Sequence, residues 1–381
     1  MNYFPIKQSE VYITILLLPL LMVGCSYTPE IKQQGDKITI DLEAKDVGLL
    51  NLEVKSIIKL DSNNESLFGD IIAIKFYKDK LYILDQFDAN TLFMFSSDGK
   101  FLKKIEIGRG PGEMLKPHAF DIDESNDEII IHDEMLFSFY YFDLDLNFVK
   151  KVKHNYIIQD FKKIGIDSYL IRSPEWRGVE VTETTTRLKT YAFVSDNFKS
   201  RKLFDIGISR NVVPTTLSNP ISTYKNKTLF ISSFNNNIYQ LINNSIRIEY
   251  SVDFGKHTFT DEEFASMSNF EMLKLIDEKE RLGLFLSIID SDEFLVFDCA
   301  PFPTSTFFYS YKSKVSFRLD DCIEEGVIPQ CQVMGYMGDN TYYALVKPGD
   351  FMSFTQSHKE YSNIIVSESA NPLFLTFKIN E

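Results

Sequence analysis

The chain has few cysteines and histidines for its length, and neither residue is grouped as in known metal sites. Its 381 residues include four cysteines and five histidines, with no Cys-x-x-Cys and no His-x-x-x-His pair. Zinc sites usually carry such spacings. Asp143 to Asn147 begins like a calcium loop but lacks the required glycine, so a hairpin turn fits it better. We therefore expect no metal ion and no cofactor.

Short catalytic motifs are also missing. The sequence has no Gly-x-Ser-x-Gly, no phosphate loop ending in Gly-Lys-Ser/Thr and no dinucleotide fingerprint. We name no catalytic residue and expect a protein that is not an enzyme. Carboxylates are plentiful, so an acid and base pair formed in the fold is the alternative.

Positive charge is scarce. Lysine and arginine number 40 against 54 aspartates and glutamates, which gives a formal net charge of −14. Residues 1–24 contribute nothing to this balance, because Lys7 and Glu10 cancel. Such a surface is a poor partner for nucleic acid and for anionic membranes. We expect no nucleic acid among the partners.

The apolar run at the N-terminus, from Val11 to Val23, is too short for a comfortable membrane span. It is followed by Gly24 and Cys25, as in the signal sequences whose cysteine becomes acylated. We expect a lipoprotein signal peptide over 1–24, a lipidated Cys25 with a tether over 25–37, and one domain over 38–381. A buried cysteine after an apolar helix is the alternative.

Three further cysteines are an odd number for disulfides. Cys322 and Cys331 could close a small loop, and Cys299 would then be free. Three unpaired buried thiols in a sheet-rich core are the other possibility.

A single tryptophan stands against 33 phenylalanines and 19 tyrosines, and 44% of the residues are hydrophobic. This composition favours strands and a large core. Within it, an aromatic strand, a turn of Asp, Asn, Gly or Ser, and a second strand recur at roughly 45–65 residues, the period of propeller blades. The five copies lie at 95–104, 142–151, 193–199, 239–246 and 307–315.

Six near-continuous apolar runs precede or follow these turns, and such strands belong inside stacked sheets. They lie at 80–85, 128–133, 168–172, 228–232, 293–298 and 341–345. We take them as the inner strands of six blades. Three end in Asp85, Asp133 and Asp298, which would either lie near a channel mouth or simply end the strand in a turn.

A propeller must close its ring, because an open blade exposes a sheet edge. The strand from Leu52 to Leu60 has no turn partner, and Pro372 to Lys378 ends the chain as another strand. We expect these two strands to pair within one blade. The predicted fold is therefore all-β: a six-bladed propeller of four-stranded antiparallel blades.

Two helical insertions interrupt the pattern. Thr260 to Glu263 has capping-box spacing, and apolar residues then share one face up to about Arg281. Met352 to Tyr361 is the second candidate. We expect both to pack on the propeller, with a partner-binding groove as the alternative. Ser173 to Lys189 is expected to be a long excursion, in which Trp176 either packs on the edge or stacks on a sugar.

The glycine-rich stretch Gly108 to Glu113, followed by Pro117 and Phe120 to Asp123, resembles the inter-blade signature of NHL-type propellers. It is similar to that of a family of six-bladed β-propeller lipoproteins from Gram-negative bacteria. The ending Asn371 to Lys378 is similar to that family's closing strand. The resemblance implies the propeller fold and export, and it transfers little chemistry. Physically, Pro111 and Gly112 suit a type II turn, with an anion-holding loop as the alternative.

We expect a non-enzymatic binding module whose site includes Arg109, Glu113 and His118 near a channel mouth. Its partners would be the membrane, through a lipid on Cys25, and a small molecule, a glycan or an envelope protein. Its location would be the outer membrane, with no acidic run after Cys25 to favour the surface over the periplasmic face. The alternative is an exported hydrolase or lyase in which Asp85, His132, Asp133 or Asp298 holds a metal or acts as acid and base.

Overall fold

The computed structural model describes residues 35–42, 51–69, 71–173, 191–195, 198–204, 219–232, 235–300 and 305–380. All of them belong to the compact unit that spans residues 31–381. The signal peptide, Cys25 and Trp176 lie outside the described residues, so the expectations about them remain predictions. Within the described part, no helix is long and apolar enough to cross a membrane.

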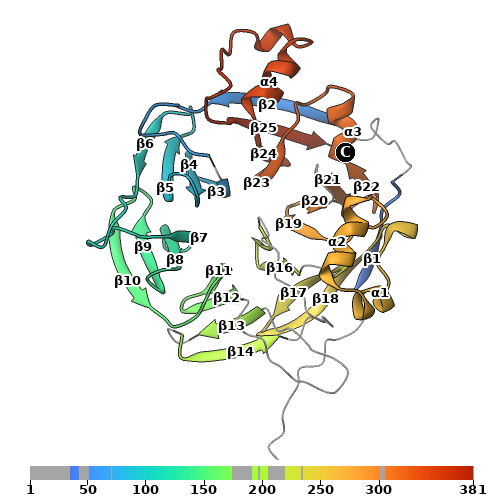
Figure 1. The fold of residues 1–381 in the computed structure, drawn as a ribbon, viewed down its shortest axis with the longest axis horizontal. Helices are drawn as coiled ribbons and strands as arrows, with labels where there is room; N and C mark the ends of the chain where they lie inside the picture. Colours follow the sequence, from blue (N-terminus) through green and yellow to red (C-terminus); the bar gives the residue numbers. More distant parts are fainter. Residues whose placement is uncertain are drawn as a thin grey trace, which may run out of the picture. The chain divides into compact units, whose positions relative to one another are not determined.

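Six antiparallel sheets follow one another around a ring (Figure 1). The first three blades take their strands in chain order. Blade 1 consists of β3 (Ile71–Tyr77), β4 (Lys80–Asp85), β5 (Thr91–Ser96) and β6 (Phe101–Lys104). Blade 2 consists of β7 (Pro117–Asp123), β8 (Glu128–Asp133), β9 (Ser138–Asp143) and β10 (Phe148–Lys153). Blade 3 consists of β11 (Asp160–Gly165), β12 (Ser168–Arg172), β13 (Tyr191–Ser195) and β14 (Ser200–Phe204).

Of the remaining three blades, blades 4 and 6 include strands from the start of the described chain. Blade 4 consists of β15 (Ile221–Tyr224), β16 (Lys227–Ile231), β17 (Asn237–Ile242) and β18 (Ser245–Asp253), and β1 (Asp36–Thr39) pairs in parallel with β18. Blade 5 consists of β19 (Phe285–Asp290), β20 (Phe294–Cys299), β21 (Ser305–Ser310) and β22 (Ser316–Arg318). Blade 6 consists of β23 (Gln332–Gly338), β24 (Thr341–Val346), β25 (Leu373–Asn380) and β2 (Asn51–Lys59). The predicted six-bladed fold is confirmed.

The closing strand pair is also confirmed. β2 runs antiparallel to β25, with Leu52 opposite Ile379 and Lys59 opposite Leu373. β2, which precedes all the other strands of blade 6 in the chain, therefore supplies its outer strand. This explains why the sequence repeats five turns but six apolar strands. The turn joins the third strand of a blade to the fourth, and blade 6 takes its fourth strand from the other end of the chain.

One assignment was wrong. The six apolar runs are the second strands of the blades, β4, β8, β12, β16, β20 and β24, and not the innermost ones. The second strand is the most apolar because sheet neighbours flank it on both sides and adjacent blades cover both its faces. Ile129, Ile130 and Ile131 in β8, for example, have no exposed surface. The innermost strands border the central opening and keep polar side chains.

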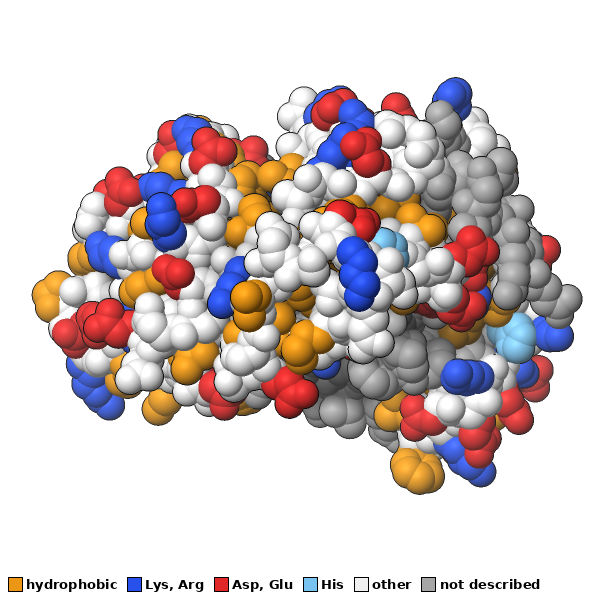
Figure 2. All heavy atoms as spheres, turned by 90° about the horizontal axis from the view of Figure 1, so that it is seen from above, with side chains coloured by type: hydrophobic (Ala, Val, Ile, Leu, Met, Phe, Trp, Pro, Cys, Tyr) orange, Lys and Arg blue, Asp and Glu red, His pale blue; other side chains and the backbone are white. Residues whose placement is uncertain are grey.

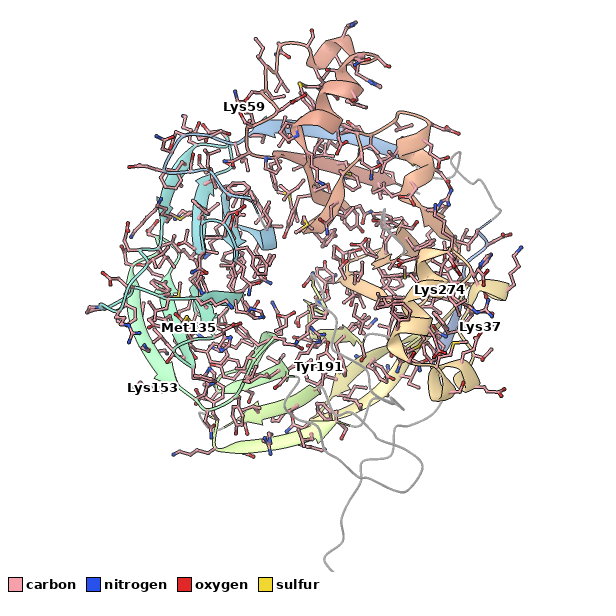
Figure 3. All side chains as sticks on the ribbon, in the orientation of Figure 1. Lys37, Lys59, Met135, Lys153, Tyr191 and Lys274 are labelled. Atoms are coloured by element: carbon pink, nitrogen blue, oxygen red, sulfur yellow. The ribbon has the colours of Figure 1, made fainter. Side chains whose placement is uncertain are left out.

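The hydrophobic core is divided among the six blade junctions, and side chains fill the space between neighbouring blades (Figure 3). Tyr191, labelled there, has no exposed surface and donates its hydroxyl to the Ile231 carbonyl oxygen of the next blade at 2.7 Å. The innermost strands also touch in ring order, and β23 of blade 6 meets β3 of blade 1. Each blade is thus stabilised by both neighbours.

The first helical insertion is two helices where one was predicted. α1 (Asp261–Ser266) and α2 (Asn269–Asp277) each begin with a capping box, on Thr260 and on Ser268. The second box supplies a new N-terminus at Ser268, and this divides the apolar stripe. Met272 and Ile276 are buried in the cluster under the helices, whereas Phe270 is 79% exposed.

The second insertion contains α4 (Pro348–Thr355) and the 3₁₀ turn η3 (Lys359–Tyr361), so it begins earlier than predicted. Pro348 takes the first helical position, where its missing N–H costs nothing. A third helix, α3 (Leu319–Glu324), follows β22 and was not predicted. The remaining 3₁₀ turn is η2 (Gly255–His257).

The cysteines of the described chain are unpaired. Cys299 and Cys322 are buried and Cys331 is half-buried. Of the two possibilities that the sequence left open, the structure has three free thiols. Burial raises the pKa of Cys322 to about 11, which keeps this thiol protonated and unreactive.

Acidic and basic side chains are interspersed on the rim of the ring (Figure 2). Several of them form ion pairs between hairpins of adjacent blades, such as Lys78 with Asp127 at 2.6 Å. Exposed pairs of this kind stabilise a fold little. They do keep charge of a single sign from accumulating on this face.

Candidate functional site

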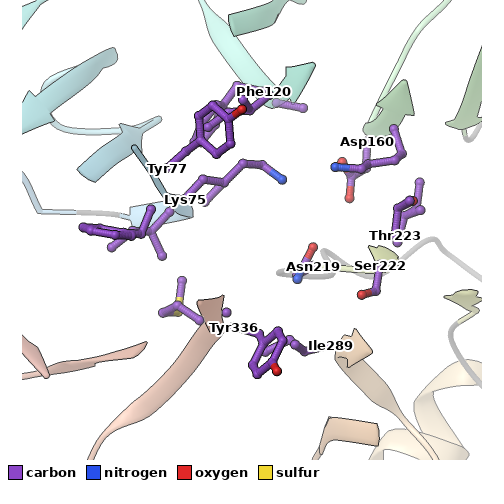
Figure 4. A pocket seen from close by; sticks show the side chains of 18 of the residues that line it. Lys75, Tyr77, Phe120, Asp160, Asn219, Ser222, Thr223, Ile289 and Tyr336 are labelled. Atoms are coloured by element: carbon purple, nitrogen blue, oxygen red, sulfur yellow. The ribbon is translucent and has the colours of Figure 1, made fainter. Parts of the chain in front are cut away.

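A cavity of about 640 Å³ lies in the middle of the ring and is lined by the innermost strands of all six blades. Its volume lies within the range of small-molecule sites. Side chains of β3, β7, β11, β15, β19 and β23 converge on it (Figure 4). The fold places them there because the first strand of every blade runs beside the ring axis.

One wall carries two lysines and a buried carboxylate. Lys75 of β3 and Lys162 of β11 line the cavity, and Asp121 of β7 lies behind them with no exposed surface. Asp121 Oδ1 is 2.6 Å from Lys162 Nζ and 3.3 Å from Lys75 Nζ. Its other oxygen accepts the Lys163 amide at 2.9 Å. Three blades are thus joined at one carboxylate.

The lysines and the nearby amide set the protonation of this carboxylate. Burial disfavours the charged form of Asp121, but Lys162 and Lys75 outweigh it and hold the Asp121 pKa below its usual range. The pKa of Lys75 is lowered by its own burial and by the neighbouring charge of Lys162. The group is therefore two cations around one anion.

Asp160, the first residue of β11, faces Lys75 across the cavity (Figure 4). Its carboxylate accepts a hydrogen bond from the Phe161 amide at 2.7 Å, and no other hydrogen bond to it occurs within the described chain. Burial raises the Asp160 pKa to about 6, and Lys75 and Arg172 only partly offset this effect. Asp160 is thus a carboxyl group poised to change protonation near neutral pH.

The opposite wall combines neutral side chains with Asp290 and Lys225. Asn219 precedes β15, and its side-chain amide donates to the Ile288 carbonyl oxygen of blade 5 at 3.2 Å. Ser222 of β15 accepts the Asp290 amide at 2.9 Å. Asp290 itself is held by the Tyr311 hydroxyl, and burial raises its pKa. These bonds fix the wall and leave the side-chain oxygen of Asn219 facing the cavity (Figure 4).

Aromatic side chains surround one mouth. Tyr77, Tyr224 and Tyr336 come from blades 1, 4 and 6 and line the cavity where the innermost strands end. The rings of Tyr224 and Tyr336 meet edge to face with centroids 5.4 Å apart. Tyr336 also donates its hydroxyl to Asp292 at 2.9 Å. These rings are positioned to cover an apolar face of a ligand.

Of the three residues predicted to bind ligand, the structure brings only His118 to the cavity. His118 lies in β7 at the other mouth, beside Gln86, and its Nδ1 is 3.0 Å from a carboxylate oxygen of Glu134. Burial lowers the His118 pKa, so the ring is neutral at pH 7. Arg109 and Glu113 are not among the residues that line the cavity.

The glycine-rich stretch forms a joint between blades 1 and 2. Glu113 accepts the Gly110 amide at 2.7 Å, which folds the stretch upon itself. Gly112 has a φ of 80°, and a Cβ there would lie 2.7 Å from Phe148 Cβ. The expected turn, with positive φ after Pro111, is therefore what this stretch adopts.

The four residues of the enzyme alternative lie outside the cavity lining. Asp85 accepts the amides of Gly69, Asp88 and Ala89 at 2.7–3.0 Å, and Asp133 accepts those of Leu115, Lys116 and Leu136 at 2.6–3.2 Å. Asp298 accepts the hydroxyls of Ser287 and Thr306, both at 2.7 Å. Asp85 and Asp133 thus hold the links that lead into blades 1 and 2, whereas Asp298 joins strands within blade 5. His132 packs among aromatic rings between blades 2 and 3.

Sequence reasoning missed Lys75, Asp121, Asp160 and Lys162. Each lies on an innermost strand whose pattern is less apolar than that of the following strand, and no motif marks them. The available signal was positional, because a charged residue inside the first strand of a blade points either to a neighbour or to the channel. Within the described chain, no cluster of three or more His, Cys, Asp or Glu side chains is placed to hold a metal ion.

Comparisons with known proteins agree with the fold. A family model described as "Domain of unknown function (DUF4934)" matches residues 52–378, which is most of the chain. A "putative exported protein" from Bacteroides fragilis NCTC 9343 is similar in structure, with a TM-score of 0.71, 15% identity, and coverage of 91% of this chain and 100% of that one. No curated protein matches.

Two further structures are more distant. A member of the DUF4221 family from Bacteroides vulgatus ATCC 8482 has a TM-score of 0.54 and 10% identity, over 87% of this chain and 99% of that one. A virginiamycin B lyase from Staphylococcus aureus has a TM-score of 0.44 and 10% identity, over 86% and 99%. Identities this low show a shared fold alone, and the lyase carries no argument about activity.

Proposed function

The chain belongs to the DUF4934 family, and for this member we propose a non-enzymatic binding protein that holds a small polar ligand in the cavity at the centre of the ring. The observation that carries the proposal is the cavity itself. Six strands from six blades supply its wall, and that wall combines charged, amide, hydroxyl and aromatic groups. Ligand sites in proteins have this composition.

The rigidity of the wall favours binding over chemistry. Asp121 is held by two lysines and an amide, Asp290 by a tyrosine hydroxyl, and Ser222 by a backbone amide. Groups fixed in this way are pre-organised for recognition, which lowers the entropic cost of binding. Of the four residues named for an enzyme, Asp85, Asp133 and Asp298 are hydrogen-bonded within the frame of the fold, and His132 is buried away from the cavity.

Thermal unfolding in the presence of a small-molecule collection tests the binding proposal. A ligand at a hundred times its dissociation constant adds about 2.7 kcal/mol of stability, which should raise Tm by about 4 °C. Thr223 of β15 lines the cavity (Figure 4), so the larger side chain of Thr223→Trp should obstruct the site and reduce the shift. Ile166→Trp is the control, because Ile166 is 88% exposed in a hairpin turn. An undiminished ligand-induced shift in the Tm of Thr223→Trp would show that the ligand binds elsewhere.

We also propose that the protein is exported and anchored to the outer membrane by a lipid on Cys25, with the residues between Cys25 and β1 as the tether. Support comes from the apolar run before Gly24 and Cys25 and from the structural similarity to the Bacteroides fragilis protein described as a "putative exported protein". Labelling cells with a radioactive fatty acid tests the anchor. The natural chain should carry label and Cys25→Ala should not; label on the variant would refute the lipid anchor.

The acidic composition supports a further part of the proposal, that nucleic acid is not a partner. In this interpretation an envelope protein or a glycan would reach the site only through a segment small enough to enter the cavity.

A further inference from the structure

The wall formed by Lys75, Lys162 and Asp121 carries more positive than negative charge. Two ammonium groups share one carboxylate, and both lysines line the cavity while Asp121 has no exposed surface. The ammonium side chains keep 26% and 16% of their accessible surface, so solutes can reach them. These three residues therefore present a net positive charge to the cavity, which Asp160 opposite them offsets when its carboxyl group is ionised.

The lysines also have donors to spare. An ammonium group has three N–H donors and no acceptor. Asp121 Oδ1 takes the contacts of both lysines, and Asp121 Oδ2 is already occupied by the Lys163 amide. Most of the donors must then be satisfied from the cavity side. An oxyanion placed between the two lysines would accept them and would relieve the repulsion between the two cations.

Asp160 faces the same space with the opposite chemistry. As a carboxylate it would repel an anion held by Lys75, but as a carboxylic acid it would donate a hydrogen bond to one. Burial raises its pKa to about 6, so the neutral form is accessible at mildly acid pH.

The surroundings of Asp160 supply few other charges. These are Lys75 from β3, Asp121 from β7 and Arg172 from β12, with Lys162 beside it on β11 and Tyr191 from β13 nearby. The segment leading into β15 presents Asn219, which carries no charge, and His118 of β7 is neutral at pH 7. Asp160 is therefore the group in this wall whose charge an entering anion would change.

We propose that the ligand of the central cavity is a small organic anion, a carboxylate or phosphate on a polar body the size of a sugar. Its charged group lies between Lys75 and Lys162, and its binding favours the protonated form of Asp160, which takes its proton from solvent. This inference rests on the proposed binding function and names its ligand class. The tyrosines at the mouth and the Asn219 amide oxygen face the uncharged part of the ligand.

Calorimetric titration with four sugars that share one ring tests the proposal. The probes are glucuronate, glucose 6-phosphate, glucose and glucosamine, each with the purified protein at pH 5.5 and at pH 8.0. At least one of the two anions should bind at pH 5.5 about tenfold more tightly than glucose, and glucosamine should bind least. The preferred anion identifies whether the charge is a carboxylate or a phosphate.

Proton uptake is the second readout. At pH 6.5, heats measured in two buffers with different ionisation enthalpies should show net uptake of a fraction of a proton, roughly one half, on binding. Affinity should fall by up to tenfold between pH 5.5 and pH 8.0, since one pKa unit corresponds to a tenfold change. Glucuronate is the decisive probe here, because it does not itself titrate in this range. In Asp160→Asn both the proton uptake and this loss of affinity should disappear.

Lysine variants locate the charge. Lys75→Met and, separately, Lys162→Met should each remove most of the preference for the anion over glucose, and either variant suffices if the other fails to fold. Lys153→Met is the matched control, since Lys153 is exposed on the outer strand β10 (Figure 3) and should leave the preference unchanged.

The failures are distinguishable. If none of the four sugars binds at 20 mM, both the cavity function and the anion inference fall. If glucose or glucosamine binds as tightly as the anions, the cavity function stands and the anion inference is wrong. If the anions bind without proton uptake, or with uptake that persists in Asp160→Asn, the role of Asp160 is overturned.

Discussion

Asp133 and Asp160 lie on adjacent blades and have opposite surroundings. Asp133 ends β8, has no exposed surface and accepts three backbone amides. Asp160 begins β11, borders the cavity and accepts one amide. A carboxylate whose acceptor sites are filled by the backbone is part of the frame. One that lacks donors is costly in its charged form, and it is the better marker of a site where a ligand can contribute.

The largest change in stability is expected at Asp133. Asp133→Ala removes the acceptor for the amides of Leu115, Lys116 and Leu136 and should lower the free energy of unfolding by about 3–5 kcal/mol, since each buried unsatisfied donor costs about 1–3 kcal/mol. Urea denaturation measures the change. Asp133→Asn keeps one carbonyl oxygen and should lose clearly less. A loss below 1 kcal/mol for the alanine variant would mean that these bonds are not what holds the link.

Replacement of Asp160 should change the free energy of unfolding in the opposite direction. Because its pKa is raised from 3.8 to about 6, the folded state binds its proton more tightly than the unfolded state. The resulting stability is present below pH 4 and is lost as the pH rises through 6. Asp160→Asn should therefore be more stable than the natural protein at pH 8 by about 1–2 kcal/mol, after allowance for screening by solvent.

At pH 4 the same variant should show no gain, and this supplies the internal control. Urea denaturation at the two pH values checks the difference. A variant that is less stable at pH 8 would show that Asp160 already has partners that satisfy its charge.

Asp298 sharpens the comparison because it combines features of both. It lies near the end of β20 and accepts two hydroxyls, as a frame residue would, yet burial raises its pKa to about 6. Asp298→Asn keeps one acceptor and adds donors that the hydroxyl oxygens of Ser287 and Thr306 can accept. We expect stability at pH 7 to change by less than about 1 kcal/mol in either direction, and ligand binding to stay the same. Thermal unfolding and titration with glucuronate measure these two quantities.

The smallest effect is expected in the glycine-rich joint. Glu113→Gln keeps a side-chain oxygen that can accept the Gly110 amide, so stability should fall by only about 0.5 kcal/mol. Arg109→Ala should change stability even less, because this side chain is exposed. Neither variant should alter glucuronate binding in calorimetry. A clear loss of glucuronate binding in either variant would show that the glycine-rich joint belongs to the binding site, as the sequence first suggested.

Much of the fold could be predicted because it depends on local patterns. The aromatic hairpins with polar turns, the six apolar strands and the pairing of Leu52 to Leu60 with the chain end all follow from alternation and turn chemistry. The errors arose where local pattern is ambiguous. An apolar run marks a strand flanked on both faces, but it does not say whether that strand is first or second in its blade, and a second capping box at Ser268 divides a stripe that looks continuous.

The sequence alone determined that this chain is a closed six-bladed ring, because each repeat can bury its faces only against its neighbours. It also determined that Gly112 occupies a tight joint, because positive φ there favours glycine. Only the tertiary structure decided that Lys75, Asp121, Asp160 and Lys162 meet at one cavity. They come from three blades, and their charges act on one another strongly only after the ring brings them together in surroundings that water screens less than it screens an open chain.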